Sequence, residues 1–502
     1  MSNNLLSIRH VTARYLNNIL LKQLSFTINK GENWALIGES GSGKSALLQT
    51  IAGRFNITGG EIRYYFYEDF LTAHPDTDAT TSTHQKMMAI VEPTHHFRNL
   101  SNTTEFYYQQ RYNSSDSEDA LTVDEYLRSM PHLSLQNNYW DLQKAITTLR
   151  LENLLDKQLI KLSNGETKRL RIAAALVKNP ALLLLDAPLT GLDVQTRADF
   201  NDIIKEIIAS GITIIMATSP YEIPEGITDI AILKDGEIIQ TLKKTEFDPT
   251  QFVQNNYEKT DRSKLRALLN GDTGENKFSF IVKMNHVHIK YGDKVILDDI
   301  NWQILPGERW ALLGPNGAGK STLLSLINGD NPQAYANDIV LFDRKRGTGE
   351  SIWDIKRKTG FVSPELHQYF PTENSCLQVI ESGYYDTLGL FRPSQKAKAD
   401  AALGWMQALE IDKYARNLLK NVPASVQRLC LLARALIKNP DLLIFDEPCQ
   451  GMDTHQQAHF KSIINTICDM SNVTLIYVTH YQHEIPDSVT KVLRLDKGKV
   501  VE

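Results

Sequence analysis

The sequence contains few of the features that mark secreted or membrane proteins. Four of its 502 residues are cysteine, and these four lie in its second half without a CxxC pair: Cys376, Cys430, Cys449 and Cys468. Reduced structural thiols are therefore expected rather than a disulfide framework. No apolar run reaches the roughly 18 residues that a membrane helix needs, and MSNNLLSIRHVTARY at the start lacks an export signal. We expect a cytoplasmic protein without a membrane span, either free or docked at the inner membrane face.

A strong excess of charge of one sign is also lacking. The formal net charge is −5, which gives no global electrostatic reason to expect nucleic-acid binding. Hydrophobic residues make up 42% of the chain, enough for more than one core, and the length suggests two or three domains. Composition leaves the partner open.

The sequence contains an internal repeat of one domain-sized unit. GENWALIGESGSGKSALL, starting at Gly31, aligns with GERWALLGPNGAGKSTLL, starting at Gly307. Further along, KNPALLLLDAP aligns with KNPDLLIFDEP, and the first copy holds about 16 more residues between these motifs. The repeat indicates a tandem duplication.

The spacing of the repeats predicts the domain organisation. We expect a first domain at residues 1–244, a linker at 245–277 with a short helix around SKLRALL, and a second domain at 278–502. Short apolar runs such as ALLLL, ITIIMA and TLIYV are typical of buried parallel strands. Alternation with helical segments predicts an α/β fold in each copy.

Residues from about 64 to 129 differ from the rest of the first copy. They include the polar run AHPDTDATTSTHQ and the aromatic segment EFYYQQRY, and their periodicity is weak. A surface insertion is one interpretation, and a surface that docks a partner is the other.

Each copy contains a glycine-rich phosphate-binding motif. GESGSGKS and GPNGAGKS both fit GxxxxGK[ST], and each follows an apolar strand and precedes a helical pattern. Glycines let backbone N–H groups wrap phosphates, the lysine reaches the β- and γ-phosphates, and the hydroxyl binds Mg²⁺. The expected ATP-binding positions are Gly38, Glu39, Ser40, Gly41, Ser42, Gly43, Lys44 and Ser45, with Gly314, Pro315, Asn316, Gly317, Ala318, Gly319, Lys320, Ser321 and Thr322 in the second copy.

Further residues are expected at the two nucleotide sites. Asp186 and Asp446 end apolar strands, where they can hold Mg²⁺ together with Ser45 and Ser321. Tyr15 and Tyr291 each lie 23 residues before a phosphate motif, and this equal spacing favours adenine stacking over a role in the core.

Three further motifs accompany the paired phosphate motifs: KLSNGETKRLRIAAALVKNP in the first copy, and EPCQGMD followed by IYVTH in the second. With them, the sequence resembles the ATP-binding-cassette (ABC) ATPases. The resemblance covers nearly the whole chain, and it implies an α/β fold of two tandem P-loop NTPase domains, each with a mostly parallel core sheet and a helical subdomain. It implies a head-to-tail domain pair with two ATP molecules at the interface, where a capping helix of one domain meets the γ-phosphate held by the other.

When the family's functional residues are carried over one by one, the two copies of the repeat keep different ones. LSNGE places Ser163 and Gly165 at an intact cap, whereas VPASVQ places Pro423 and Ser425 in a damaged one. Glu447 corresponds to the general base and His480 to the γ-phosphate contact; the first copy has Ala187 and Ser219 instead.

If the domains pair head to tail, all the residues that depart from the family pattern at these positions lie in one of the two composite sites. The hydrolytic site would combine Lys320, Glu447 and His480 with the cap of Ser163 and Gly165. ATP hydrolysis at this site alone follows as the expected activity.

The sequence leaves several partners possible. Pro93 and Pro364 occupy the place of a family glutamine that contacts Mg²⁺ and couples to a transporter. The segment from Asn331 to His367 resembles the ModF type of tandem ABC proteins, named for molybdenum transport, which implies membrane-transporter subunits as partners. A nucleotide-gated switch and a ribosome- or DNA-associated mechanical ATPase are the alternatives.

Overall fold

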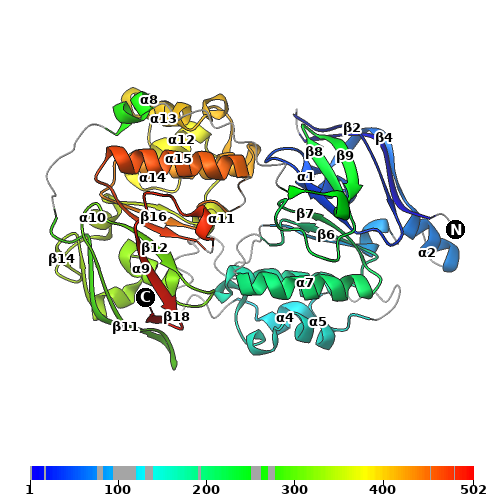
Figure 1. The fold of residues 1–502 in the computed structure, drawn as a ribbon, viewed down its shortest axis with the longest axis horizontal. Coiled ribbons are helices and arrows are strands. Elements are labelled where there is room, and N and C mark those ends of the chain that lie inside the picture. Colours follow the sequence, from blue (N-terminus) through cyan, green and yellow to red (C-terminus); the bar gives the residue numbers. More distant parts are fainter. Residues whose placement is uncertain are drawn as a thin grey trace. The chain divides into compact units, whose positions relative to one another are not determined.

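Two units make up the described part of the chain. The computed structural model describes residues 3–15, 18–75, 83–93, 120–130, 139–189, 194–249, 262–269, 278–450, 452, 454–479 and 481–501. Residues up to 249 belong to the first unit and residues from 262 to the second. Figure 1 shows both units in sequence colours, and each is described by itself below.

The first unit contains the buried strands expected from its apolar runs. Its described residues form a six-stranded sheet in the order β5-β6-β7-β3-β8-β9. Neighbouring strands are parallel, except that β9 pairs with β8 in the antiparallel direction. Every residue of β3, β6 and β7 is buried, because one face of the sheet packs against helices and the other packs against a helix and the antiparallel sheet described next. The strands are β3 (Trp34–Ile37), β5 (Met88–Val91), β6 (Leu182–Asp186), β7 (Thr213–Ala217), β8 (Asp229–Lys234) and β9 (Glu237–Lys243).

A second, antiparallel sheet and a set of helices complete the first unit. The sheet has the order β2-β1-β4 among the described residues, from β1 (Asn4–Tyr15), β2 (Asn18–Asn29) and β4 (Asn56–Tyr64). The α-helices are α1 (Lys44–Ile51), α2 (Tyr65–Ala73), α4 (Val123–Arg128), α5 (Leu142–Thr148), α6 (Asn164–Leu176) and α7 (Val194–Ala209).

The second unit repeats this arrangement. Where the structure describes it, the main sheet runs β15-β16-β17-β12-β18-β19 and the antiparallel sheet β11-β10-β13-β14. The strands are β10 (Val282–Tyr291), β11 (Lys294–Ile304), β12 (Arg309–Leu313), β13 (Asp338–Leu341), β14 (Arg344–Lys345), β15 (Thr359–Val362), β16 (Leu442–Asp446), β17 (Thr474–Val478), β18 (Lys491–Asp496) and β19 (Lys499–Val500).

The helices of the second unit cover its sheet in the same way (Figure 1). They are α8 (Arg262–Leu268), α9 (Lys320–Asn328), α10 (Ile352–Lys356), α11 (Pro364–Tyr369), α12 (Cys376–Glu381), α13 (Lys396–Ala408), α14 (Ala424–Leu436) and α15 (Thr454–Met470). The repeat and the mostly parallel sheets confirm the predicted α/β fold of two tandem P-loop domains. None of the helices in the described ranges combines the length and hydropathy that a membrane crossing needs.

Two segments have more structure than their sequences suggested. Within the stretch around residues 64–129, β5 pairs with β6 in the main sheet, so part of this stretch belongs to the core of the first unit. The aromatic segment around residue 107 lies outside the described residues. In the expected linker, the short helix is α8, and its Leu265 is fully buried against the core of the second unit.

Candidate functional site

The phosphate motif of the first unit forms the loop between β3 and α1. Gly38, Gly41 and Gly43 have φ angles of 149°, 82° and 105°, a region that glycine adopts without strain. A Cβ at Gly38 would lie 2.2 Å from the carbonyl oxygen of Leu233, so only glycine fits there. The Lys44 ammonium closes the loop by donating to the carbonyls of Gly38 at 2.7 Å and Glu39 at 2.8 Å.

The second phosphate motif has the same geometry between β12 and α9. Gly314, Gly317 and Gly319 have φ angles of 147°, 81° and 102°. A Cβ at Gly314 would lie 2.3 Å from the carbonyl oxygen of Leu495. Lys320 donates to the carbonyls of Gly314 at 2.7 Å and Pro315 at 3.0 Å. Both loops thus form the glycine cradle that phosphate binding requires.

The aspartates of the two sites lie at the ends of parallel strands. Asp186 ends β6 and Asp446 ends β16, with exposed fractions of 5% and 9%. Burial raises the pKa of Asp186, and hydrogen bonding from the Ser45 hydroxyl and the charge of Lys44 oppose that shift. A serine hydroxyl beside a buried carboxylate is a donor set that suits Mg²⁺. The residues present therefore fit the metal, and Ser45 and Asp186 would hold it in the first site.

The position after each aspartate has an unusual backbone conformation. Ala187 and Glu447 have φ angles of 47° and 45°, in the left-handed region that few non-glycine residues adopt. The Ala187 N–H donates to the carbonyl of Ala217 at 2.9 Å, and the Glu447 N–H donates to that of Val478 at 2.9 Å. The backbone is therefore the same in both units, and only the second has a carboxylate there.

The two tyrosines lie on equivalent hairpins. Tyr15 ends β1 and is 49% exposed; Tyr291 ends β10 and is 39% exposed. Each hairpin continues into a strand that approaches the phosphate loop: a Cβ on Gly43 would lie 3.4 Å from the carbonyl oxygen of Leu20, and one on Gly319 would lie 3.0 Å from that of Ile296. The Tyr291 hydroxyl accepts a hydrogen bond from Asn331 at 3.0 Å.

The expected capping helices begin at the predicted residues but differ in their first turns. Ser163 precedes α6 and forms a capping box: its hydroxyl accepts from the Glu166 N–H at 3.3 Å, and its own N–H donates to Glu166 at 2.7 Å. Burial alone would raise the pKa of Glu166, but Lys157 at 2.7 Å and Ser163 hold it below its ordinary value. Pro423 precedes α14 and makes no side-chain cap.

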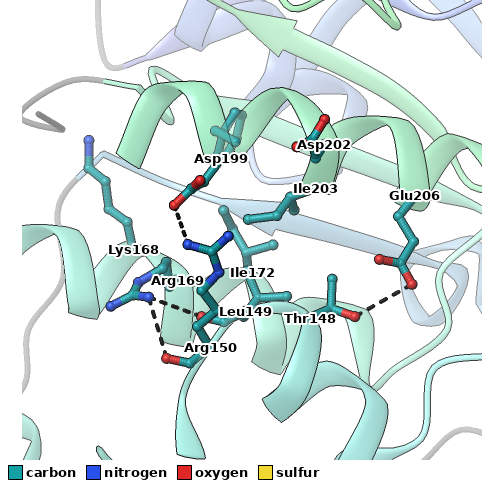
Figure 2. Close-up of a pocket in the computed structure, with 11 residues that line it drawn as sticks. Thr148, Leu149, Arg150, Lys168, Arg169, Ile172, Asp199, Asp202, Ile203 and Glu206 are labelled. Atoms are coloured by element: carbon teal, nitrogen blue, oxygen red, sulfur yellow. Dashed lines mark hydrogen bonds and ion pairs between the residues drawn. The ribbon is translucent and has the colours of Figure 1, made fainter. Parts of the chain in front are cut away.

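The base of α6 is fixed to its neighbours by charged side chains. Figure 2 shows Arg169 reaching the carbonyls of Leu149 and Arg150, at 3.4 Å and 3.3 Å. Arg150 pairs with Asp199 of α7 across a cavity of about 200 Å³. Arg169 thereby ties the first half of α6 to the segment at the end of α5, and Arg150 ties that segment to α7.

The remaining expected positions are only partly described. Ser219 follows β7, and His480 lies outside the described residues. Pro364 is the first residue of α11, and the hydroxyl of the preceding Ser363 accepts from the Leu366 N–H at 3.1 Å. Pro93 follows Glu92, whose carboxylate binds Gln49 at 2.7 Å.

Sequence reasoning missed two side chains beside Glu447. The Gln450 amide donates to the Glu447 carboxylate at 3.2 Å, and Arg428 of α14 donates to the Gln450 carbonyl oxygen at 3.0 Å. Arg428 and Gln450 are 22 residues apart, and no motif couples them. Their contact depends on the packing of α14 against the end of β16.

Two α/β domains, each with a glycine cradle and a buried aspartate, define a tandem P-loop nucleotide-binding protein. The family described as ABC transporter matches residues 21–190 and 297–450. These matches cover more than half of the chain, so the chain belongs to the ABC transporter family, whose domains bind ATP, normally with Mg²⁺.

Relatives with the same two-domain length support this assignment. The chain is 31% identical to the ABC transporter ATP-binding protein ModF of Escherichia coli (strain K12), covering 97% of this chain and 95% of that protein. It is also 31% identical to an uncharacterised ABC transporter ATP-binding protein of Schizosaccharomyces pombe, covering 96% of each. The resemblance to fused ABC domains of the ModF type is thereby confirmed.

A solved structure shares the fold over nearly the whole chain. The archaeal ribosome recycling factor, in complex with an archaeal ribosomal stalk protein, matches 98% of this chain and 88% of that chain with a TM-score of 0.53. The identity is 18%, so this likeness concerns the fold alone.

Proposed function

We propose that the protein hydrolyses ATP at one composite site and retains ATP at another, with its two domains pairing head to tail. The hydrolytic site takes its phosphate loop from the second domain and its cap, Ser163 and Gly165, from the first. The degenerate site takes its phosphate loop from the first domain and its cap, Pro423 and Ser425, from the second. Closure on two ATP and opening after one hydrolysis would do mechanical work on a partner.

The observation that carries this proposal is the distribution of the differences between the domains. The cap with a hydroxyl and a capping box lies in the domain that has Ala187, while the uncapped Pro423 lies in the domain that has Glu447. Taken alone, neither domain has both an intact cap and the carboxylate. Head-to-tail pairing brings the intact cap and the carboxylate into one site.

Each residue of the hydrolytic site has a distinct task. Lys320 binds the β- and γ-phosphates, and Ser163 with the Gly165 backbone stabilises the γ-phosphate at a helix N-terminus. Glu447 accepts a proton from the attacking water, and His480 contacts the γ-phosphate. Mg²⁺, held by Ser321 and Asp446, would offset negative charge on the phosphates.

The decisive test is the variant Glu447→Gln. Loss of a general base lowers a rate by about 10²- to 10⁴-fold, so steady-state ATPase activity should fall in this range. ATP affinity, measured with a fluorescent nucleotide, should persist because both phosphate loops are unchanged. The matched variant is Ala187→Glu, whose backbone at φ 47° already matches that of Glu447.

Ala187→Glu should restore little hydrolysis by itself, because Ser219, Pro423 and Ser425 remain in that site. An Ala187→Glu protein that doubles its turnover, or a Glu447→Gln protein that keeps it, would contradict the assignment of the two sites.

The resemblance to ModF-type proteins extends the proposal to a transport partner, with molybdate uptake as the implied process. Purification of the protein from its own cells tests this part. Recovery of membrane-transporter subunits would support it; recovery of ribosomes, or of no partner, would favour the mechanical ATPase or the nucleotide-gated switch.

A further inference from the structure

A cation and an amide form a hydrogen-bonded chain that ends on the carboxylate of Glu447. Arg428 donates through Nη2 to Oε1 of Gln450 at 3.0 Å. Gln450 in turn donates through Nε2 to Oε2 of Glu447 at 3.2 Å. The chain is polarised in one direction, because its first donor is positive and its last acceptor is the carboxylate.

Backbone hydrogen bonds fix the last two members of this chain, Gln450 and Glu447. The turn after β16 is closed by a hydrogen bond from the Gln450 N–H to the Glu447 carbonyl at 3.1 Å. The Glu447 N–H is itself fixed to Val478 of β17 at 2.9 Å. Gln450 therefore approaches Glu447 from a defined direction, rather than from a loose loop.

The Arg428 guanidinium remains a cation in this setting. Burial lowers its pKa to about 10, while the nearby Glu447 and Cys449 oppose the shift, so the group is protonated at neutral pH. The neighbouring His367 adds no second charge. Burial, together with Arg428, lowers the pKa of His367 to about 3, and its Nε2 lies 2.9 Å from Oε1 of Gln427.

The first unit provides an internal comparison for this cation. Lys168 aligns with Arg428, and its ammonium lies 3.4 Å from the carbonyl oxygen of Ala187. Figure 2 shows Lys168 projecting away from the cluster of Arg150, Arg169 and Asp199. A positive charge therefore lies near the end of this strand in both units, but only in the second unit is the strand's final aspartate followed by a carboxylate, Glu447.

We infer that Arg428 and Gln450 are positioning residues for Glu447, which hold its carboxylate in one rotamer for proton abstraction. This role rests on the proposed function of Glu447 as the general base. Neither residue needs to touch ATP. Their removal should therefore lower kcat and leave nucleotide binding unchanged.

The experiment compares Gln450→Ala, Arg428→Met, Arg428→Lys and the double variant Arg428→Met/Gln450→Ala in the full chain. Each of the first two should lower kcat by about 10-fold, with the KM for ATP and its binding affinity within about twofold. Arg428→Lys should recover at least about a third of the lost kcat, since it keeps the charge and a donor. The double variant should be no slower than the slower single variant, because both act through one chain.

Arg434→Met is the matched control for loss of an arginine from the same helix. Arg434 is buried in α14, but it donates to Ser382 at 3.2 Å and to the carbonyl of Thr387 at 3.1 Å. This variant should lower the unfolding temperature and leave kcat per folded molecule unchanged. Gln450→Ala removes only one amide from a partly exposed turn, so it tests the chain even where Arg428→Met folds poorly.

The outcomes separate the two proposals. If Glu447→Gln keeps full turnover, the proposed function fails. If Glu447→Gln loses turnover while Gln450→Ala and Arg428→Met keep their kcat, only the positioning role fails. Equal losses of kcat in Arg428→Met and Arg434→Met, or multiplied losses in the double variant, would show a merely structural role and overturn the inference.

Discussion

The two domains have nearly the same backbone where their main strands end, and different side chains on it. Ala187 and Glu447 have φ angles within a few degrees of each other, and both N–H groups bond to the neighbouring parallel strand. A left-handed backbone costs an alanine about 1 kcal/mol or more. The first domain thus keeps a strained turn without the carboxylate that the turn presents in the second.

The helix starts show the reverse difference. Ser163 has the capping box in the first domain, and Pro423 has no side-chain cap in the second. The cradle for phosphate is thus built twice, whereas each domain has only some of the groups expected for hydrolysis. This difference gives the head-to-tail proposal its sharpest tests.

Among the variants that exchange residues between the two domains, Gly165→Ser has the largest expected effect; it places in α6 the residue found at Ser425. In the proposed head-to-tail pairing, a serine side chain would occupy the space where the Gly165 backbone approaches the γ-phosphate held by Lys320. We expect steady-state ATP turnover to fall by about 10²- to 10³-fold, the range for loss of a preorganised donor. Folding should persist, because serine favours a helix more than glycine does.

The reciprocal variant Ser425→Gly is the control for this change. It should alter turnover by less than about twofold, since Ala187, Ser219 and Pro423 remain in its site. If both variants reduce turnover equally, or if Gly165→Ser has no effect on a protein with an intact second phosphate loop, the pairing of sites is wrong.

The sequence predicted those features that depend on short, local patterns. The glycine loops, the strands ending at Asp186 and Asp446, and the helix starts at Ser163 and Pro423 are all fixed by neighbouring residues. The contact of Arg428 with Gln450 could not be predicted, because it arises from packing between distant segments. Strand β5 shows the limit of local patterns, because its four residues give no clear period; the resemblance to the family indicated a strand before Pro93.

A second effect, of intermediate size, concerns Asp186→Asn in the first domain. Folding raises the pKa of the Asp186 carboxyl above its value in the unfolded chain. Between these two pKa values the folded chain binds more protons than the unfolded chain, so the free energy of unfolding falls as the pH rises. At neutral pH the amide should therefore stabilise the protein without nucleotide by about 0.5–2 kcal/mol. Thermal unfolding, monitored by circular dichroism between pH 5 and 8, measures this gain.

The same variant distinguishes the two sites in function. Asp186→Asn should reduce the stabilisation by Mg²⁺-ATP but keep most turnover, whereas Asp446→Asn should lose nearly all turnover. Similar loss of activity in both variants would mean that the first site also hydrolyses ATP.

The smallest expected effect is that of Pro423→Ser, which supplies α14 with a side-chain cap. The backbone at Pro423 (φ −53°, ψ 148°) is close to that of Ser163 (φ −70°, ψ 165°), so a serine can accept from the helix N–H groups there. A cap contributes about 1 kcal/mol, and loss of the rigid proline offsets roughly half of it. We expect a net gain near 0.5 kcal/mol in the free energy of unfolding, which Pro423→Ala should not show. Turnover should stay unchanged in both variants, because in the proposed head-to-tail pairing a repaired cap would still face Ala187 and Ser219. A rise in turnover with Pro423→Ser would place hydrolysis in the site that we propose to be degenerate.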